Sequence, residues 1–242
     1  MDKSTIQVIA MDLDGTLTQH KQPLSPLTRS TLEALGRRYR LLMVGAGQVQ
    51  RIFGQMERFP IDIIGNYGMQ FAEWDSAAGA LAVRRDEHVP VDRPEILRRA
   101  GVLRDTFGLH DFAGETMEFH ESGMLTFPIL GTKARIEDKL AYDPDRSRRK
   151  KMYDRVRELF SDYTVFIGGS SSFDIVPRPF CKRYALERYM AEHGLTAANV
   201  AYCGDDYGPG GNDHDVYESD VLFVTIDDYR ALESRVRESG LL

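Results

Sequence analysis

Two carboxylates, Asp12 and Asp14, stand two residues apart after a short apolar run and are followed directly by Gly15. Residues two apart in an extended chain point to the same side, so both acids face one way. Because neighbouring buried carboxylates repel each other, such a pair needs a cation, and a divalent metal suits hard oxygen ligands. Gly15 would let the backbone turn sharply after them. The stretch predicts an acidic, metal-dependent site, with an ordinary strand end and a capping aspartate as the alternative.

A second acidic strand end follows the apolar run 200–203, where Asp205 comes after a glycine. In open parallel sheets, ligands bind in the crevice at the carboxyl ends of the strands. We therefore expect Asp205 to lie near Asp12 and Asp14 and this group to bind Mg²⁺, which takes oxygen ligands and keeps several waters. Lys182 would balance the negative charge of the group.

A glycine turn ends the apolar run 41–44, at Gly45 and Gly47. A strand, a glycine turn and the beginning of a helix form a natural anion site. The turn also resembles half of a dinucleotide-binding fingerprint, which would suggest a nicotinamide-dependent oxidoreductase. The third glycine and a suitably spaced ribose-binding acid are missing, so a tight strand-to-helix turn is the better interpretation.

Short apolar runs alternate with helical patterns at both ends of the chain, whereas the middle has a different pattern. The strands expected at the two ends are 6–11, 41–44, 61–64, 200–203 and 221–225, with helices over 26–38 and 228–236 and a hairpin of 69–71 with 80–83. The middle is expected to form strands 117–119, 125–129, 165–167 and 172–176, with helices over 94–107 and 146–160. This order predicts an α/β, Rossmann-like core with a parallel sheet from residues 1–83 and 178–242. Residues 84–177 are expected to form an inserted α+β domain.

Composition limits the classes of partner. The net charge of −6 argues against a surface dominated by polyanion binding, and no apolar run has the length of a membrane span. The basic run 146–151 is followed by Asp154 and Glu158, so we expect a solvated, salt-bridged helix face and no nucleic-acid site. Two distant cysteines without metal spacing suggest a reducing compartment, and we expect a cytoplasmic protein.

The stretch Asp12-Leu13-Asp14-Gly15-Thr16-Leu17 resembles the signature of the haloacid dehalogenase (HAD) superfamily of phosphotransferases. A calcium loop fits less well because a third ligand before the glycine and a later glutamate are missing. The resemblance implies that Asp12 is a nucleophile forming an aspartyl-phosphate and that Asp14 is a general acid and base. Lys182 would contact the nucleophile and the phosphate. Asp12, Asp205 and the backbone carbonyl of Asp14 would bind Mg²⁺.

A closer resemblance, to the eukaryotic-type phosphomannomutases, covers nearly the whole chain. It rests on 123–125, Gly168-Gly169 with Ser172-Phe173-Asp174, 182–184 and Pro209-Gly210-Gly211-Asn212-Asp213. This family has a cap of the class IIB type, which closes over a small phosphorylated substrate and commonly mediates dimerisation. The substrate-binding positions that the resemblance implies are Lys21, Gly45, Gly47, Lys139, Ser172, Asp174 and Asn212.

The chain departs from that family where the distal phosphate of the substrate would bind. Lys21, His120, Thr132 and Lys139 stand where arginines are expected, and Gly47 replaces a hydroxyl residue. Lysine keeps the charge but loses the bidentate fork of arginine. A mutase must hold a bisphosphate in two orientations, whereas a phosphatase needs one phosphate and water. We therefore expect a Mg²⁺-dependent phosphohydrolase of a small phosphorylated metabolite, a sugar phosphate. A phosphomannomutase and a catalytically weak sugar-phosphate-binding protein are the alternatives.

Overall fold

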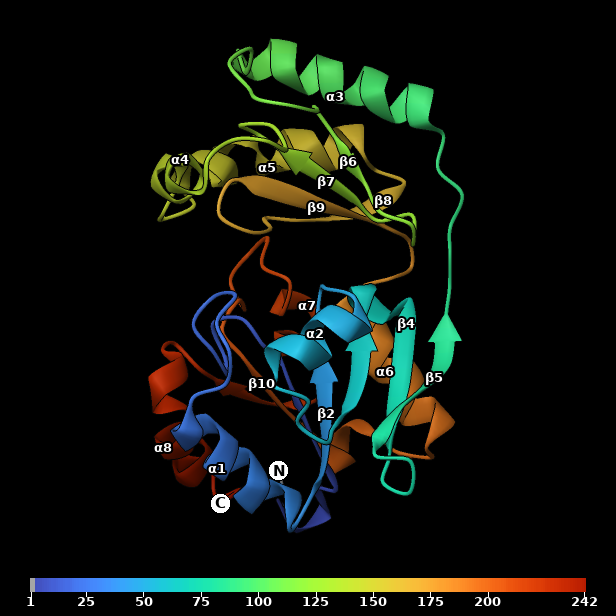
Figure 1. Cartoon of the computed structure of the whole chain (residues 1–242), viewed down its shortest axis with the longest axis vertical. Helices are drawn as coiled ribbons and strands as arrows, with labels where there is room; N and C mark the ends of the chain where they lie inside the picture. Colours follow the sequence, from blue (N-terminus) through green and yellow to red (C-terminus); the bar gives the residue numbers. More distant parts are fainter. Residues whose placement is uncertain (1–2) are drawn as a thin grey trace. The chain divides into compact units, whose positions relative to one another are not determined.

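The computed structural model describes residues 3–242, which form two compact units (Figure 1). The first unit comprises the described residues up to Asp86 together with Lys182–Gly208 and Asp213–Leu242. The second comprises Glu87–Cys181 and Pro209–Asn212. Each unit has a sheet and a hydrophobic core of its own.

The first unit is built on a seven-stranded sheet in the order β11-β10-β1-β2-β3-β4-β5. The five strands from β11 to β3 are parallel, and β4 and β5 are added as an antiparallel hairpin. The strands are β1 Val8–Met11, β2 Arg40–Val44, β3 Asp62–Gly65, β4 Gln70–Asp75, β5 Ala80–Asp86, β10 Val200–Gly204 and β11 Leu222–Thr225.

Strand β1 is the central one of the five parallel strands, and all four of its residues are buried. Its last residue, Met11, pairs with Cys203 of β10 on one side and with Met43 of β2 on the other. Since all three strands run in the same direction, the residues that follow them meet at one edge of the sheet. This register places Asp12 between the acidic end of β10 and the glycine turn after β2.

Helices cover both faces of the core sheet because successive strand residues point to opposite sides. Ile9 and Met11 pack with α1, α2 and α8, while Val8 and Ala10 pack with α6. The helices are α1 Pro26–Gly36, α2 Val49–Gln55, α6 Lys182–Glu192, α7 His214–Tyr217 and α8 Leu232–Glu238, with 3-10 turns at Lys3–Thr5, Asn66–Gly68, Ala197–Asn199 and Tyr229–Ala231.

The second unit has a four-stranded antiparallel sheet in the order β6-β7-β9-β8. Alternate residues such as Phe127 and Phe173 join a core with α3 and α5, which lie along one face of the sheet (Figure 1). The elements are β6 Glu118–Phe119, β7 Leu125–Pro128, β8 Tyr163–Phe166, β9 Ser172–Pro177, α3 Arg93–Phe107, α4 Ile136–Tyr142 and α5 Ser147–Leu159.

The predicted α/β class with a parallel sheet is confirmed, and element ends differ from the expected ones by a few residues. Helix α4 was missed, because a seven-residue segment is too short to show a clear helical period. One expectation is wrong for a single residue. Arg149, within the basic run expected to be solvated, is buried and bonds to Asp143 at 2.8 Å. Among the described residues, no helix is both long and apolar enough to cross a membrane.

Candidate active site

The carboxyl ends of β1 and β10 bring three carboxylates together. One ligand oxygen each from Asp12, Asp205 and Asp213 lies within 4.8 Å of the others. Asp12 follows β1, Asp205 follows β10, and Asp213 ends the loop that leads to α7. The topology of a parallel sheet thus produces the acidic group expected from Asp12 and Asp205. Asp213, which the sequence offered as a less certain ligand or as a residue that orients Lys182, joins this group.

Lys182, the first residue of α6, is fully buried against these acids. Its Nζ donates to Oδ1 of Asp12 at 2.6 Å and to Oδ1 of Asp213 at 2.7 Å. Asp213 also accepts from the hydroxyl of Tyr202 at 2.6 Å and from the backbone N–H of Asp206 at 3.1 Å. With these partners, Asp213 is held as the counter-ion that fixes the ammonium beside Asp12.

The charges of Lys182 and the acids shift each other's protonation. Burial alone would lower the pKa of Lys182, but the carboxylates of Asp12 and Asp213 outweigh it and raise that pKa, so the amine stays charged. Burial raises the pKa of Asp12 well above its usual value; Lys182 opposes this, and the charges of Asp213 and Asp205 add to it. One ammonium therefore does not offset three carboxylates, and a further cation would keep Asp12 ionised.

Asp205 lies directly over the turn after Asp14. A Cβ built on Gly15 would come within 2.8 Å of the carboxyl carbon and both carboxylate oxygens of Asp205. Gly15 also has a φ of +102°, which favours glycine. The hydroxyl of Thr16 donates to Oδ1 of Asp205 at 2.9 Å. The turn therefore requires a glycine for two independent reasons, and it fixes the carboxylate of Asp205 beside the end of β1.

These groups fit a divalent metal ion. Burial, followed by repulsion from Asp213, raises the pKa of Asp205 to about 6, and a cation bound there would offset both effects. Carboxylate oxygens are the ligands that Mg²⁺ prefers. Asp12 and Asp205 would hold the ion. The sequence predicts the backbone carbonyl of Asp14 as a third ligand. Asp213 already accepts three hydrogen bonds and is the poorer ligand of the group.

The raised pKa of Asp205 predicts a pH-dependent stability without metal. A carboxyl with a raised folded pKa favours folding below its unfolded pKa of about 3.9, and this contribution is lost as the pH rises through about 6. The total loss should be about 3 kcal/mol, with roughly half of it between pH 5 and 7.5. Urea unfolding in EDTA would measure the difference between the native protein and Asp205→Asn at both pH values.

Asp220→Asn, at an exposed position, is the matched control and should show no such pH-dependent difference. Mg²⁺ at pH 7.5 should stabilise the native protein more than Asp205→Asn, because the ion binds the ionised carboxylate. A difference between native protein and Asp205→Asn that is the same at both pH values would contradict the assignment.

Asp14 is oriented by groups from two other segments. Its Oδ1 accepts from the backbone N–H of Lys21 and from Nε2 of Gln55, both at 2.7 Å. Nη1 of Arg51 lies 3.9 Å from its other oxygen. Lys21 thus reaches the site through its backbone, at a left-handed φ of 58°. Gln55 and Arg51 were not predicted; their spacing of four on a helix after the glycine turn was the available signal.

The glycine turn after β2 is fixed through its carbonyl groups. Those of Gly45 and Gly47 accept from the N–H groups of Tyr67 at 3.2 Å and of Asn66 at 2.8 Å. The N–H groups of Ala46 and Gly47 donate to no acceptor within residues 3–242. The anion contact predicted at this turn therefore has open backbone donors, but position 47 offers no side chain.

Other predicted substrate-binding residues belong to the second unit. Ser172 and Asp174 alternate with the core residues Phe173 and Ile175 of β9, so they share the opposite face of the sheet. Asp174 pairs with Thr126 of β7, whose hydroxyl is 2.9 Å from Nε2 of His120. The structure thus gathers Ser172, Asp174 and His120 on one polar face.

The remaining predicted positions of this unit lie in loops or short elements. Nζ of Lys139 in α4 donates to the carbonyl of Thr132 at 3.1 Å. Asn212 lies in the segment Pro209–Asn212, which groups with the second unit. Its neighbour Gly210 accepts from the N–H of Ile167 at 2.9 Å. The contacts of these residues with a substrate stay predictions.

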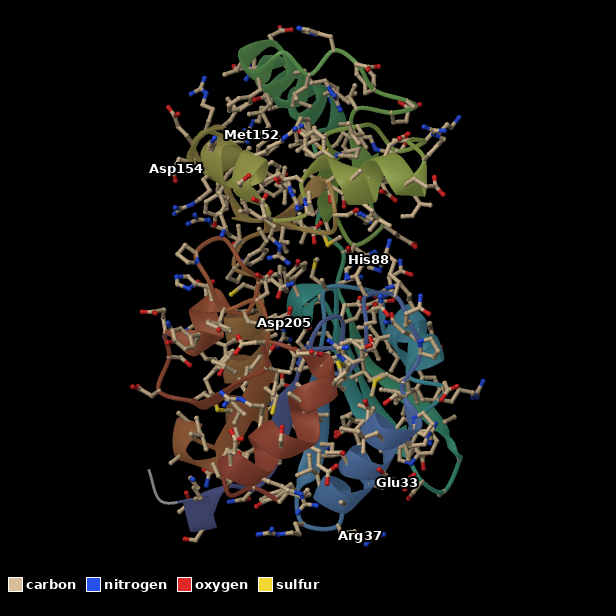
Figure 2. The ribbon with its side chains drawn as sticks, turned by 90° about the vertical axis from the view of Figure 1, so that its left-hand side faces the viewer. Glu33, Arg37, His88, Met152, Asp154 and Asp205 are labelled. Atoms are coloured by element: carbon tan, nitrogen blue, oxygen red, sulfur yellow. The ribbon has the colours of Figure 1, made fainter. Side chains whose placement is uncertain are left out.

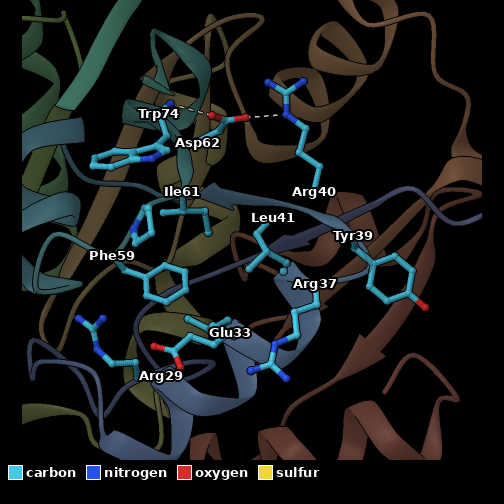
Figure 3. A pocket seen from close by; sticks show the side chains of 13 residues that line it. Arg29, Glu33, Arg37, Tyr39, Arg40, Leu41, Phe59, Ile61, Asp62 and Trp74 are labelled. Carbon is cyan, nitrogen blue, oxygen red and sulfur yellow. Dashed lines mark hydrogen bonds and ion pairs between the residues drawn. The ribbon is translucent and has the colours of Figure 1, made fainter. Parts of the chain in front are cut away.

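A hollow of about 610 Å³ lies at the opposite edge of the core sheet, beside the amino ends of β2 and β3. Two of its charged groups pair with each other: Asp62 accepts from Nε of Arg40 at 2.7 Å, and it also accepts from the N–H of Trp74 at 2.8 Å (Figure 3). Glu33 and Arg37, which also line it, lie at the far end of the first unit from Asp205 (Figure 2). This hollow is separate from the acidic site and carries none of its chemistry.

Comparison with known proteins agrees with this geometry. A family model described as eukaryotic phosphomannomutase matches residues 108–228, which is half of the 242 residues. A phosphomannomutase of Dendrobium officinale is 28% identical over 228 residues, covering 88% of this chain and 85% of the relative. A probable phosphomannomutase of Caenorhabditis elegans is 25% identical over 230 residues, covering 88% and 87%.

Solved structures share the fold at low sequence identity. The IMP-nucleotidase of Plasmodium falciparum superposes with a TM-score of 0.70 at 12% identity, covering 98% of this chain and 68% of that one. A phosphatase of the haloalkanoate (HAD) enzyme superfamily from Bacteroides thetaiotaomicron gives 0.62 at 16% identity, covering 98% and 96%. The chain thus shares the fold of a solved HAD phosphatase, and the family model that matches half of its residues shows that it belongs to the eukaryotic phosphomannomutase family.

Proposed function

We propose that this protein is a Mg²⁺-dependent phosphohydrolase that acts through an aspartyl-phosphate on a small phosphorylated metabolite, a sugar phosphate. The acidic group beside Lys182 supports phosphoryl transfer, because a buried ammonium bonded to Asp12 orients a carboxylate nucleophile. The ion would supply electrostatic stabilisation of the phosphoryl oxygens when bound.

The residues of the chain would divide the reaction into two displacements. An oxygen of Asp12 bonds to phosphorus while the bond from phosphorus to the leaving oxygen breaks, and Asp14 gives that oxygen a proton. Asp14 then takes a proton from water as the water oxygen attacks phosphorus and the bond to Asp12 breaks. Inorganic phosphate leaves, the carboxylate of Asp12 is regenerated, and Asp14 again carries the proton that it gave to the leaving oxygen in the first step. The hydrogen bonds of Asp14 to Lys21 and Gln55 would hold it in place for both proton transfers.

One observation favours hydrolysis over mutase action. Three of the four positions at which the family resemblance implies arginines for the distal phosphate lie in the second unit and hold groups already bonded within it. Nε2 of His120 is 2.9 Å from the Thr126 hydroxyl, and the Thr132 hydroxyl accepts the N–H of Glu115 at 2.9 Å. Lys139 donates to the Thr132 carbonyl. Each missing charge-assisted contact costs about 1.5–3 kcal/mol, so two losses weaken bisphosphate binding roughly a hundredfold or more.

We therefore expect net phosphate release from hexose phosphates, at least about tenfold faster than interconversion of the 1- and 6-phosphates, even with a hexose bisphosphate activator. The bisphosphate intermediate would leave the site, or water would enter it, before the intermediate could reorient. A coupled isomer assay run beside phosphate detection measures both rates on one enzyme sample.

Thr132→Arg combined with His120→Arg should shift this ratio toward transfer, because it restores forked donors. Thr106→Arg, on the exposed face of α3, adds the same side chain elsewhere in the second unit and should leave the ratio unchanged. Activator-dependent interconversion by the native protein that outpaces hydrolysis would reverse the proposal.

The family match favours phosphomannomutase as the second candidate, and that outcome of the assay would establish it. A catalytically weak sugar-phosphate-binding protein is the third candidate, suggested by the missing hydroxyl at Gly47. It would bind hexose phosphates without releasing phosphate from them or from an aryl phosphate.

A further inference from the structure

Arg51 occupies the space that a side chain at position 47 would fill. A Cβ built on Gly47 would lie within 2.6 Å of the Nε, Cζ and Nη2 atoms of Arg51. We propose that Arg51 makes the contact with the transferring phosphoryl group that a hydroxyl at position 47 would otherwise make. This inference rests on the proposed function and assigns a further substrate-contacting residue to it.

The guanidinium of Arg51 presents its open edge to this space. Its Nη1 donates to Oε1 of Gln55 at 2.8 Å and lies 3.9 Å from Oδ2 of Asp14. Its Nε and Nη2, the two nitrogens nearest to the built Cβ, donate to no acceptor in the described part of the chain. Nε–H and Nη2–H form a fork that matches two oxygens of a phosphate.

The neighbouring backbone adds donors at the same turn. The N–H groups of Ala46 and Gly47 also lack acceptors among residues 3–242, and the turn directly follows β2, next to the end of β1 that carries Asp12. The side chain of Arg51 is 46% exposed, so a ligand can reach it. Open backbone amides and an open arginine fork together form a polar edge for an anion beside the nucleophile.

The two positions are coupled by space. A serine at position 47 would put its Cβ where the fork of Arg51 lies, and the end of this flexible side chain would have to move away. A glycine at 47 therefore allows the arginine to reach the turn, and the hydroxyl and the guanidinium are alternatives. The missing hydroxyl at position 47 then need not weaken the binding of the phosphoryl group.

Calorimetric titration with inorganic phosphate in MgCl₂ buffer tests this directly. Arg51→Ala should weaken phosphate binding about 10- to 100-fold, the range expected for a charge-assisted contact, and Arg51→Lys should fall between. Arg37→Ala, an exposed arginine beside the distant hollow, is the matched control and should bind phosphate as the native protein does. Adding Gly47→Ser to Arg51→Ala should recover at least severalfold of the lost affinity.

The outcomes separate this inference from the proposed function. Native protein that releases phosphate from substrates while Arg51→Ala binds inorganic phosphate within twofold of it would overturn the role of Arg51 alone. Recovery of affinity in Arg51→Ala/Gly47→Ser supports the exchange of roles, because a merely structural arginine would not be replaced by a hydroxyl on another residue. Native protein that neither binds nor releases phosphate would overturn both.

Discussion

Replacing Asp12 by asparagine should lower kcat for phosphate release by at least about 10⁴-fold, because an amide is a poor nucleophile and the covalent route is lost. The fold should survive. Asparagine has nearly the size of aspartate, and it removes one of three crowded carboxylates. Burial, and then repulsion from the other two, raises the pKa of Asp12, so the loss of this charge does not harm the fold. Steady-state phosphate detection gives the rate, and intact-protein mass spectrometry after rapid acid quench shows whether a phosphoryl adduct forms.

Asp154→Asn is the matched control for this variant, since Asp154 is exposed on α5 of the second unit. The control should keep native turnover and a quenched phosphoryl adduct. Near-native turnover by Asp12→Asn would remove the aspartyl-phosphate from the mechanism, whatever the substrate proves to be.

The placement of the acids was predictable because it follows from strand order alone. A buried run ending in two acids, and another ending at Asp205, have to meet if their strands are parallel neighbours. In the structure, the parallel pairing of Met11 with Cys203 brings the ends of these two strands together. The sharp turn after Asp14 was also predictable, because a glycine follows the two acids. In the structure Gly15 has a positive φ, and Asp205 comes too close to leave room for a side chain there.

The groups that orient those acids could not be predicted from the sequence, because their contacts depend on how side chains from distant segments pack together. Tyr202 alternates along β10 like any core residue, yet its hydroxyl is bonded to Asp213. In the sequence Gln55 is an ordinary helix residue, but in the structure its amide donates a hydrogen bond to Asp14. Arg149 belongs to a run of charges typical of a solvated face, but it bonds the carbonyls of Gly168 at 2.7 Å and Gly169 at 3.0 Å. Hydropathy patterns carry no information about such pairings.

Lys182→Met should destabilise the metal-free protein by about 3–5 kcal/mol, the cost of leaving buried charges without their partner. Asp12 and Asp213 would keep their burial and lose the ammonium that lies 2.6 and 2.7 Å from them. The same change should lower kcat about 10²- to 10³-fold, because a preorganised cation beside the nucleophile is lost. Urea unfolding in EDTA measures the stability, and phosphate release in MgCl₂ measures the rate.

A double variant separates the two roles of Lys182. In Lys182→Met/Asp213→Asn, the second change removes the carboxylate whose main partner was the lysine, while an amide can still accept from Tyr202. Most of the lost stability should return, because one uncompensated charge has gone, yet kcat should stay low, because Asp12 still lacks its ammonium. Recovery of both would mean that Lys182 acts only by keeping the fold intact. Recovery of neither would mean that the destabilisation does not arise from the charge on Asp213.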